Sequence, residues 1–391
     1  MTIDKVLKNR PIKDESEWEG FLSYHYRFRY NVVTGRTEVY INEGWEPIDD
    51  YNFNSIYWHM RRQGGTISQR RLQSLLQSDF VDKYHPFRAY FNGLPDWDRT
   101  DWIEELAGQV QTTDQDFWQK CLKKWLVAMV ASSIDEDESV VNQTVLILQG
   151  KQGVGKSTFL NNLVPPALDD YVYSGTINPG NKDSIIHLSE TILCQLDELE
   201  TLTRYKESAI KELITKSEIR IRRPYGHFAD KLNRHASLCG SINQSTMLND
   251  STGSRRFLIH KVQAITYDHD IDMDKVFSQA LALYRDGFQY WFDGAQIQQI
   301  HAHNQQFQNQ TVEEELLLAR YQKADPDDSG ARRLQATKIL KRLHDGRLPS
   351  ASHSGSIRLG QALAKHGFQH SRSKGKKYWY VKSAKDSSKP G

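Results

Sequence analysis

One short segment constrains the fold of this chain more than any other. An apolar run at residues 145–148 leads into Gly150-Lys151-Gln152-Gly153-Val154-Gly155-Lys156-Ser157, and residues 157–160 begin a helix. A buried strand, a glycine loop and a helix in this order are the context that a phosphate-binding loop (P-loop) requires. The segment therefore predicts an α/β fold with a P-loop NTPase core.

The glycine loop predicts binding of a nucleoside triphosphate. Its glycines let backbone N–H groups turn toward phosphate oxygens without a Cβ in the way. Lys156 would then face the β- and γ-phosphates, and Ser157 would offer its hydroxyl to Mg²⁺, so ATP and Mg²⁺ are the expected cofactors. The alternative is a glycine loop without a ligand. The expected nucleotide contacts are Gly150, Gly153, Val154, Gly155, Lys156, Ser157 and Thr158.

Two acidic residues follow the next apolar strand. Asp197 and Glu198 come directly after residues 192–196. A carboxylate at this place can hold Mg²⁺ through water, and its neighbour can orient and deprotonate the attacking water. We therefore predict Asp197 as a metal residue, together with Ser157, and Glu198 as a catalytic residue. The alternative is a strand that ends in two solvated acids.

Polar residues flank the two later strands. Asn243 follows residues 236–242, where many P-loop ATPases carry a polar residue beside the γ-phosphate; the alternative is a turn-forming Asn. Arg255 and Arg256 precede an apolar run at 257–259. One of them can supply the cation that stabilises transition-state charge, usually from a neighbouring subunit. The alternative is a salt-bridged surface pair.

The composition divides the chain into parts around this core. Strand-like alternation and then helical spacing in the first part predict an α-rich or α+β domain. A polar segment with Pro and Gly predicts a linker near the end. The expected parts are an N-terminal domain at 1–98, the ATPase domain at 99–270, a helical segment completing it at 271–324, the linker at 325–330, a winged-helix domain at 331–382 and a disordered tail at 383–391.

The predicted winged-helix domain carries charge of one sign. Asp345 is the only acidic residue at 331–382, against thirteen Lys and Arg. Two helical segments precede a basic hairpin that turns at Lys374-Gly375, an order typical of a DNA-binding winged helix. The alternative is a winged helix used only for protein contact. The expected DNA contacts here are Arg358, Arg372, Lys374, Lys376 and Lys377.

Bulk properties exclude several classes of protein. Aromatic residues make up 11% of the chain, which argues against disorder, and net charge is only +2, which argues against a global field that attracts DNA or membranes. No long apolar run or leader is visible, and Cys121, Cys194 and Cys239 lack metal-ligand spacing. We expect a cytoplasmic protein with buried thiols and no membrane partner.

The order of the motifs resembles the virulence-associated protein E family. The resemblance covers roughly residues 86–259. Its motifs are the glycine loop, Leu196-Asp197-Glu198, Arg220-Ile221-Arg222-Arg223-Pro224-Tyr225-Gly226, Arg234, Gly240-Ser241-Ile242-Asn243 and Asp250-Ser251-Thr252-Gly253-Ser254-Arg255-Arg256-Phe257. That family is similar to superfamily 3 helicases and to the ATPase part of phage and poxvirus-type primase-helicases. The resemblance implies an AAA+-like, hexameric, ATP-driven ring in replication of a phage, plasmid or integrated mobile element.

The resemblance also implies roles for single residues. Asp197 and Glu198 become the Mg²⁺ and water residues, Asn243 the sensor, and Arg255 or Arg256 the arginine finger. The segment 220–231 corresponds to the insertion that carries a DNA-contacting hairpin. Independently, its cations and rings suit phosphates and bases, although a solvated basic loop is the alternative. The expected contacts are Arg220, Arg222, Arg223, Tyr225, Lys231 and Arg234.

The leading functional hypothesis is a helicase-type motor that hydrolyses ATP and acts on single-stranded or forked DNA. The alternative is a nucleotide-switched origin-binding initiator or regulator that recruits a host or element replication protein without unwinding. A third hypothesis is a switch ATPase in phage competition or defence. A polymerising activity is not expected, because no acidic constellation precedes the glycine loop.

Overall fold

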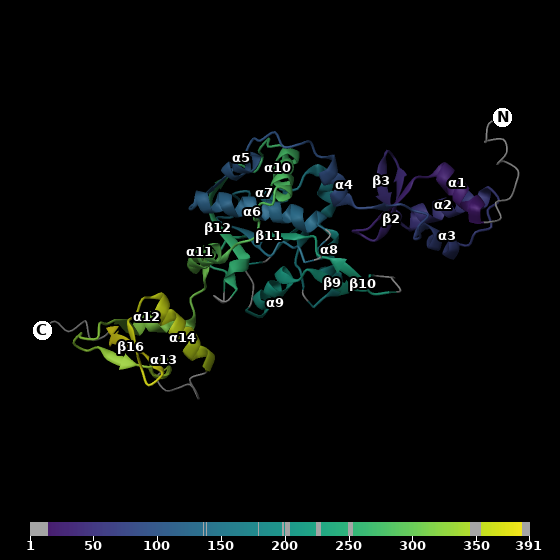
Figure 1. The fold of residues 1–391 in the computed structure, drawn as a ribbon. Helices are drawn as coiled ribbons and strands as arrows, with labels where there is room; N and C mark the ends of the chain where they lie inside the picture. The colour runs from purple at the N-terminus through teal and green to yellow at the C-terminus, as the bar shows by residue number, and fades with distance from the viewer. Residues whose placement is uncertain are drawn as a thin grey trace. The chain divides into compact units, whose positions relative to one another are not determined.

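The computed structural model describes residues 15–135, 137, 139–178, 180–197, 199, 204–223, 228–248, 253–344 and 353–384. The chain forms two compact units, Met1–Phe307 and Gln308–Gly391. Figure 1 shows the helices and strands of both units along the chain. The first unit contains a mixed α/β fold with a largely parallel sheet.

The N-terminal part of the first unit has its own small sheet, in the order β3-β2-β1-β4. The expected strand-like segment forms a hairpin, since β1 pairs antiparallel with β2. Buried Leu22, Met60 and Leu72 join the helices into a separate core. The elements are α1 (Glu15–His25), β1 (Phe28–Asn31), β2 (Arg36–Ile41), β3 (Gly44–Pro47), α2 (Asp50–Arg62), α3 (Gln69–Leu76) and β4 (Lys83–Tyr84).

The main sheet has six strands in the order β5-β12-β6-β11-β8-β7. All neighbours in it are parallel except β5, which runs antiparallel to β12. The strands are β5 (Val110–Thr112), β6 (Val145–Gln149), β7 (Val172–Gly175), β8 (Leu193–Leu196), β11 (Ser237–Ile242) and β12 (Phe257–Ile265). A two-stranded hairpin, β9 (Glu218–Ile221) and β10 (Asp230–Asn233), lies between β8 and β11 in sequence.

Helices surround this sheet. They are α4 (Pro86–Gly93), α5 (Trp102–Gly108), α6 (Gln115–Ile134), α7 (Lys156–Asn161), α8 (Lys182–Glu190), α9 (Arg204–Thr215), α10 (Met273–Arg285) and α11 (Gly294–Asn304), with short 3₁₀ turns at Pro166–Tyr171, Ser254–Arg256 and Gln305–Phe307. Helix α5 ends at Gly108, because Val110 enters β5.

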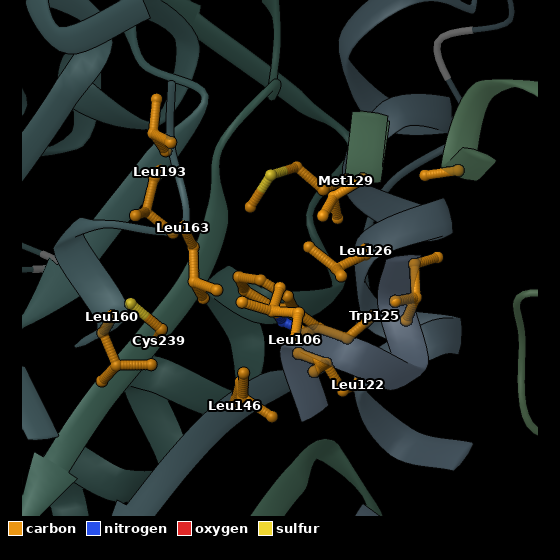
Figure 2. Close-up of a cluster of buried hydrophobic side chains, with 14 of the residues drawn as sticks. Leu106, Leu122, Trp125, Leu126, Met129, Leu146, Leu160, Leu163, Leu193 and Cys239 are labelled. Carbon is orange, nitrogen blue, oxygen red and sulfur yellow. The ribbon is translucent and has the colours of Figure 1, made fainter. Parts of the chain in front are cut away.

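Helix α6 forms the centre of the largest core. Figure 2 shows Leu122, Trp125 and Leu126 of this helix beside Leu146 of β6 and Leu160 of α7. Phe87 and Phe91 of α4 join the same core. The main body therefore begins near residue 86 rather than at the expected boundary after residue 98. The three cysteines are free and buried, as predicted.

The second unit packs three helices beside a small sheet. Its elements are α12 (Val312–Arg320), β13 (Tyr321–Lys323), β14 (Arg332–Leu334), α13 (Ala336–Leu343), α14 (His353–Lys365), β15 (His370–Ser373) and β16 (Lys376–Ser383). The predicted turn is present, and Lys374 and Gly375 both have positive φ, 48° and 74°. This pairing of positive φ values is typical of a two-residue hairpin turn.

The boundary between the two units differs from the expected one. Helix α12 belongs to the second unit, because Leu317 is fully buried among Leu340 and Leu363 of that unit. Strand β13 also pairs with β16. Residues 312–323 therefore do not complete the first unit, and the expected linker at 325–330 is an internal loop of the second.

None of the helices in the described residues combines the length and apolar composition needed to span a bilayer.

Candidate functional site

The carboxyl ends of three neighbouring strands meet at one edge of the main sheet. Gln149 of β6 lies beside Ile242 of β11, and Gly240 of β11 lies beside Leu196 of β8. The segments that follow these strands are the glycine loop, Asn243 and Asp197. In open α/β sheets, ligands bind outside the carboxyl ends of the strands. The sheet topology therefore brings together three of the sequence motifs singled out above.

Two residues of the glycine loop have a backbone conformation that favours glycine. Gly153 and Gly155 have φ values of 83° and 87°, which other residues rarely adopt. Gly150 lies against β12, where an added Cβ would come within 3.1 Å of the Val262 carbonyl oxygen. The loop is therefore tightly shaped, and α7 begins directly after it at Lys156.

Lys156 connects the loop with the neighbouring strand. Its side chain is buried, and Nζ donates to the carbonyl oxygens of Gly150 at 2.9 Å and Lys151 at 2.7 Å. It also donates to Asn243 Oδ1 at 3.0 Å. The two residues predicted to face the γ-phosphate are thus in direct contact. Ser157 and Thr158 follow on the exposed side of α7.

Ser241 is a site residue that the sequence reasoning did not select. Its Oγ lies 3.1 Å from Ser157 Oγ, so the predicted metal hydroxyl is positioned from β11. The preceding Gly240 packs closely on β8 and on Leu199 beyond it, because a Cβ there would lie 2.3 Å from Leu199 Cδ1 and 2.9 Å from the Leu196 carbonyl oxygen. The motif Gly240-Ser241-Ile242-Asn243 carries the signal, although its first two members gave no separate prediction.

The structure describes one of the two predicted acidic residues. Asp197 is exposed directly after β8, and its N–H donates to the Gly175 carbonyl oxygen at 3.1 Å. Its carboxylate therefore lies at the same sheet edge as Ser157. Glu198 lies outside the described residues. Among the described residues, no group of three or more His, Cys, Asp or Glu is arranged to hold a metal ion.

Arg255 and Arg256 lie at the opposite edge of the sheet. Phe257, which follows them, pairs with Val145 at the start of β6, and Lys261 pairs with Gln149 at its end. The length of β6, roughly 13 Å for four steps, therefore separates these arginines from the glycine loop of the same chain. The structure does not bring them together with Lys156.

The two arginines line a cavity at that edge. Its volume is about 430 Å³, and Tyr290, Trp291 and Phe292 contribute aromatic walls. Arg255 is exposed, whereas Arg256 is half-buried. Burial, and then the neighbouring Arg255 charge, lower the pKa of Arg256. Among the described residues that line the cavity, none carries a carboxylate beside these two adjacent cations.

The β9–β10 hairpin carries part of the predicted DNA contacts. Arg220 and Lys231 face each other across it, and both pair with Glu218, at 2.5 Å and 3.1 Å. These cations lower the pKa of the Glu218 carboxyl. Arg222 is exposed, while Tyr225 lies outside the described residues. Phe228, just before β10, is exposed and adds a ring to this surface.

Arg223 does not point from the hairpin to solvent as predicted. Its guanidinium donates to the carbonyl oxygens of Val33 at 2.9 Å and Thr34 at 2.5 Å, and it pairs with Glu190 of α8. Gly35 packs directly on it, since a Cβ there would lie 2.8 Å from Nε. Arg223 therefore fastens the base of the hairpin to the N-terminal sheet, and the prediction of a DNA contact is wrong.

Arg234 also has a structural role in place of the predicted DNA contact. Only 1% of the residue is exposed. Its guanidinium donates to the carbonyl oxygens of Lys216, Ala236, Asn142 and Ile214, at 2.8, 2.7, 2.7 and 3.0 Å. Burial lowers its pKa to about 10, so the group stays charged at neutral pH. A buried cation with four acceptors cannot reach a DNA phosphate.

In the second unit, too, one predicted DNA contact has a structural role and others are exposed. Arg358 of α14 makes a two-pronged pair with Glu313 of α12, one prong being Nε to Oε2 at 3.0 Å, so it holds two helices together. Lys376 and Lys377 are exposed at the start of β16. Lys377 also lies over the Trp379 ring, 4.1 Å from its centroid. Arg372 and Lys374 complete the hairpin surface beside them.

A comparison with protein families matches the part of the chain that contains the main sheet and the glycine loop. A family model of the virulence-associated protein E-like domain matches residues 91–309, more than half of the chain. A search of curated proteins found no match. Similar solved structures include two of the apo C-terminal region of NrS-1, one of them its A form. Both have 11% identity and a TM-score of 0.48, and cover 94% of this chain and 98% of that chain. These values do not define a function.

Proposed function

The chain belongs to the virulence-associated protein E-like family, and we propose that it is an ATP-dependent, DNA-directed motor of replication. The observation that carries the proposal is the contact of Lys156 with both the glycine loop and Asn243. A lysine in this position can neutralise a terminal phosphate, while the amide beside it contacts the same group. The proposal therefore begins with binding of ATP at the carboxyl edge of the main sheet.

The residues beside Lys156 suit a magnesium ion. Ser157 offers a hydroxyl and Asp197 a carboxylate, and Mg²⁺ prefers such oxygen donors together with water and phosphate oxygens. When bound, Mg²⁺ would neutralise charge on the β- and γ-phosphates. Glu198, next to Asp197, is the proposed general base that takes a proton from the attacking water. Asn243 would orient this water and the γ-phosphate.

Arg255 and Arg256 are proposed to act on a neighbouring subunit. They lie at the amino edge of the sheet, whereas the glycine loop lies at the carboxyl edge. A head-to-tail contact between two copies would bring the arginines of one copy to the phosphates of the next. Such contacts close into a ring when the rotation permits, and the proposed assembly is a hexamer.

Two surfaces are proposed to contact DNA. One is the β9–β10 hairpin with Arg220, Arg222 and Lys231. The other is the second unit, proposed as a winged helix, with Arg372, Lys374, Lys376 and Lys377 on its hairpin. Exposed cations of this kind pair with phosphates, and binding weakens as salt rises.

A strand-displacement assay tests this function. Forked DNA is incubated with ATP, Mg²⁺ and either the unmodified protein or Lys156→Ala. We expect displacement by the unmodified protein and none by the variant, because the variant lacks the charge that holds the terminal phosphates. ATP hydrolysis without displacement on forks of either polarity would refute the motor and leave a nucleotide-switched initiator.

A mixing experiment tests the shared site. Lys156→Ala inactivates the phosphate side, and the double variant Arg255→Ala/Arg256→Ala inactivates the arginine side. Each protein alone should fail to hydrolyse ATP, whereas the arginine variant should still bind it. Their mixture should recover part of the activity, since intact loops can meet intact arginines. No recovery, together with full hydrolysis by the double variant alone, would contradict the assignment.

A further inference from the structure

The order of strands gives the bound nucleotide a direction, on the premise that the glycine loop binds ATP as proposed. Asn243 follows β11 and Asp197 follows β8, and both strands lie on one side of β6. A terminal phosphate beside these residues therefore points toward that side. The sugar and base leave the loop at the other end of the triphosphate, on the side where β12 lies next to β6.

The segment that follows β12 lies against the glycine loop on that side. The Tyr267 ring packs directly on Gly155, since an added Cβ on this glycine would lie 2.2 Å from Tyr267 Cδ1. No other residue could occupy position 155 without moving the ring. Even so, 43% of Tyr267 is exposed, so the ring keeps a surface open to solvent beside the loop.

Three contacts hold this segment in place. Thr266 N–H donates to the Gln109 carbonyl oxygen at 2.9 Å, and Asn162 Nδ2 donates to the Tyr267 carbonyl oxygen at 3.0 Å. The His269 ring packs near Phe159 of α7, with centroids 5.9 Å apart. The backbone around Tyr267 is therefore fixed on one side to the segment between α5 and β5 and on the other to α7, which follows the glycine loop, and the ring is preorganised.

We infer that Tyr267 is the base-stacking residue of the nucleotide site. An exposed aromatic ring beside a phosphate-binding loop, on the side away from the γ-phosphate residues, is placed to stack on a nucleobase. Stacking of a base on an aromatic side chain is favourable for every base because each has a π-face. Tyr267 thus contributes to affinity for the nucleoside part of ATP and not to affinity for its phosphates.

Two substitutions separate stacking from packing. Tyr267→Phe keeps the ring, whereas Tyr267→Leu keeps apolar bulk against Gly155 without a π-face. Tyr51→Ala, an exposed tyrosine of α2, is the control. Titration calorimetry measures binding of ATP and of inorganic tripolyphosphate, each with Mg²⁺. We expect Tyr267→Leu to weaken ATP binding by roughly tenfold, with tripolyphosphate binding unchanged and Tyr267→Phe equal to the unmodified protein.

Each other outcome has a defined meaning. Equal ATP affinity in Tyr267→Leu and the unmodified protein overturns the inference and leaves the proposed ATPase intact. A parallel loss of ATP and tripolyphosphate binding shows that Tyr267 only shapes the loop, which also overturns it. An unmodified protein that binds neither ligand removes the proposed function itself, and the inference falls with it.

Discussion

Replacement of Arg234 gives a direct test of the structural role assigned to this buried residue. Its guanidinium donates to four backbone carbonyl oxygens from three segments of the chain. A hydrogen bond from a charged donor contributes about 1.5 kcal/mol at the lower end of the measured range, so four contribute about 6 kcal/mol. Water that enters the vacated space can satisfy some of the carbonyls.

We therefore expect Arg234→Ala to lower the free energy of unfolding by about 4 kcal/mol and the melting temperature by roughly 10 °C. Arg234→Lys should lose about half as much, because an ammonium is a point donor that cannot span the same four acceptors. Thermal unfolding followed by fluorescence measures both shifts. Arg222→Ala, at the exposed residue that follows β9, is the matched control and should change stability by less than about 0.5 kcal/mol.

Measurements of DNA affinity provide a second test of the structural role of Arg234. The structure predicts that Arg222→Ala weakens binding to single-stranded DNA, whereas folded Arg234→Lys binds as the unmodified protein does. A finding that Arg234→Lys retains full stability but loses DNA affinity and salt dependence would refute the reasoning. Arg234 would then contact phosphate, as the sequence had predicted.

Three further results are expected. Gly240→Ala should impair ATP binding and lower thermal stability, because its Cβ would press on the end of β8; an unchanged dissociation constant would contradict this. Burial lowers the pKa of His85 and His235 to about 4, so the unfolded chain takes up protons first as pH falls. The free energy of unfolding should thus fall as the pH is lowered from 6.5 to about 4. In His235→Asn, the melting temperature should depend less on pH. Replacing Lys376 and Lys377 with Ala should reduce the salt slope of DNA binding by roughly two, measured by anisotropy.

The sequence predicted the strand before the glycine loop and the helix after it, because their signals are local. A positive φ at Gly153 and Gly155 and a strand before the loop are properties of a few consecutive residues. Lys156 and Asn243 were each predicted to face the γ-phosphate, and their direct contact arises because β6 and β11 are adjacent parallel strands. The contact of Ser241 with Ser157 and the position of Tyr267 beside Gly155 were not predicted, because both depend on strand order, which no local pattern contains.

The predicted DNA contacts show that the charge of a residue in the sequence does not reveal whether its side chain is exposed. Arg222 and Arg223 are adjacent and chemically identical, yet one is exposed and the other is bound by Glu190 and two backbone carbonyls. The two residues differ because the turn at Gly35 and helix α8 both approach Arg223, which the sequence around the two arginines does not show. Likewise, α12 belongs to the second unit because Leu317 is buried in its core and because Glu313 and Glu314 pair with α14, and neither contact is visible in the sequence of α12 alone.

The hydrogen bonds of Arg223 to the N-terminal turn affect where the chain can be truncated. A fragment limited to the family-matched residues 91–309 would lack the Val33 and Thr34 carbonyls that hold Arg223. It would also lack Asn31, whose Nδ2 donates to the Tyr171 hydroxyl at 2.8 Å. In such a fragment Arg223 would keep its pair with Glu190 but lose both backbone acceptors, and the hairpin would be loosened at its root. The smallest fragment with a native hairpin thus begins before β1, about sixty residues upstream of the family boundary.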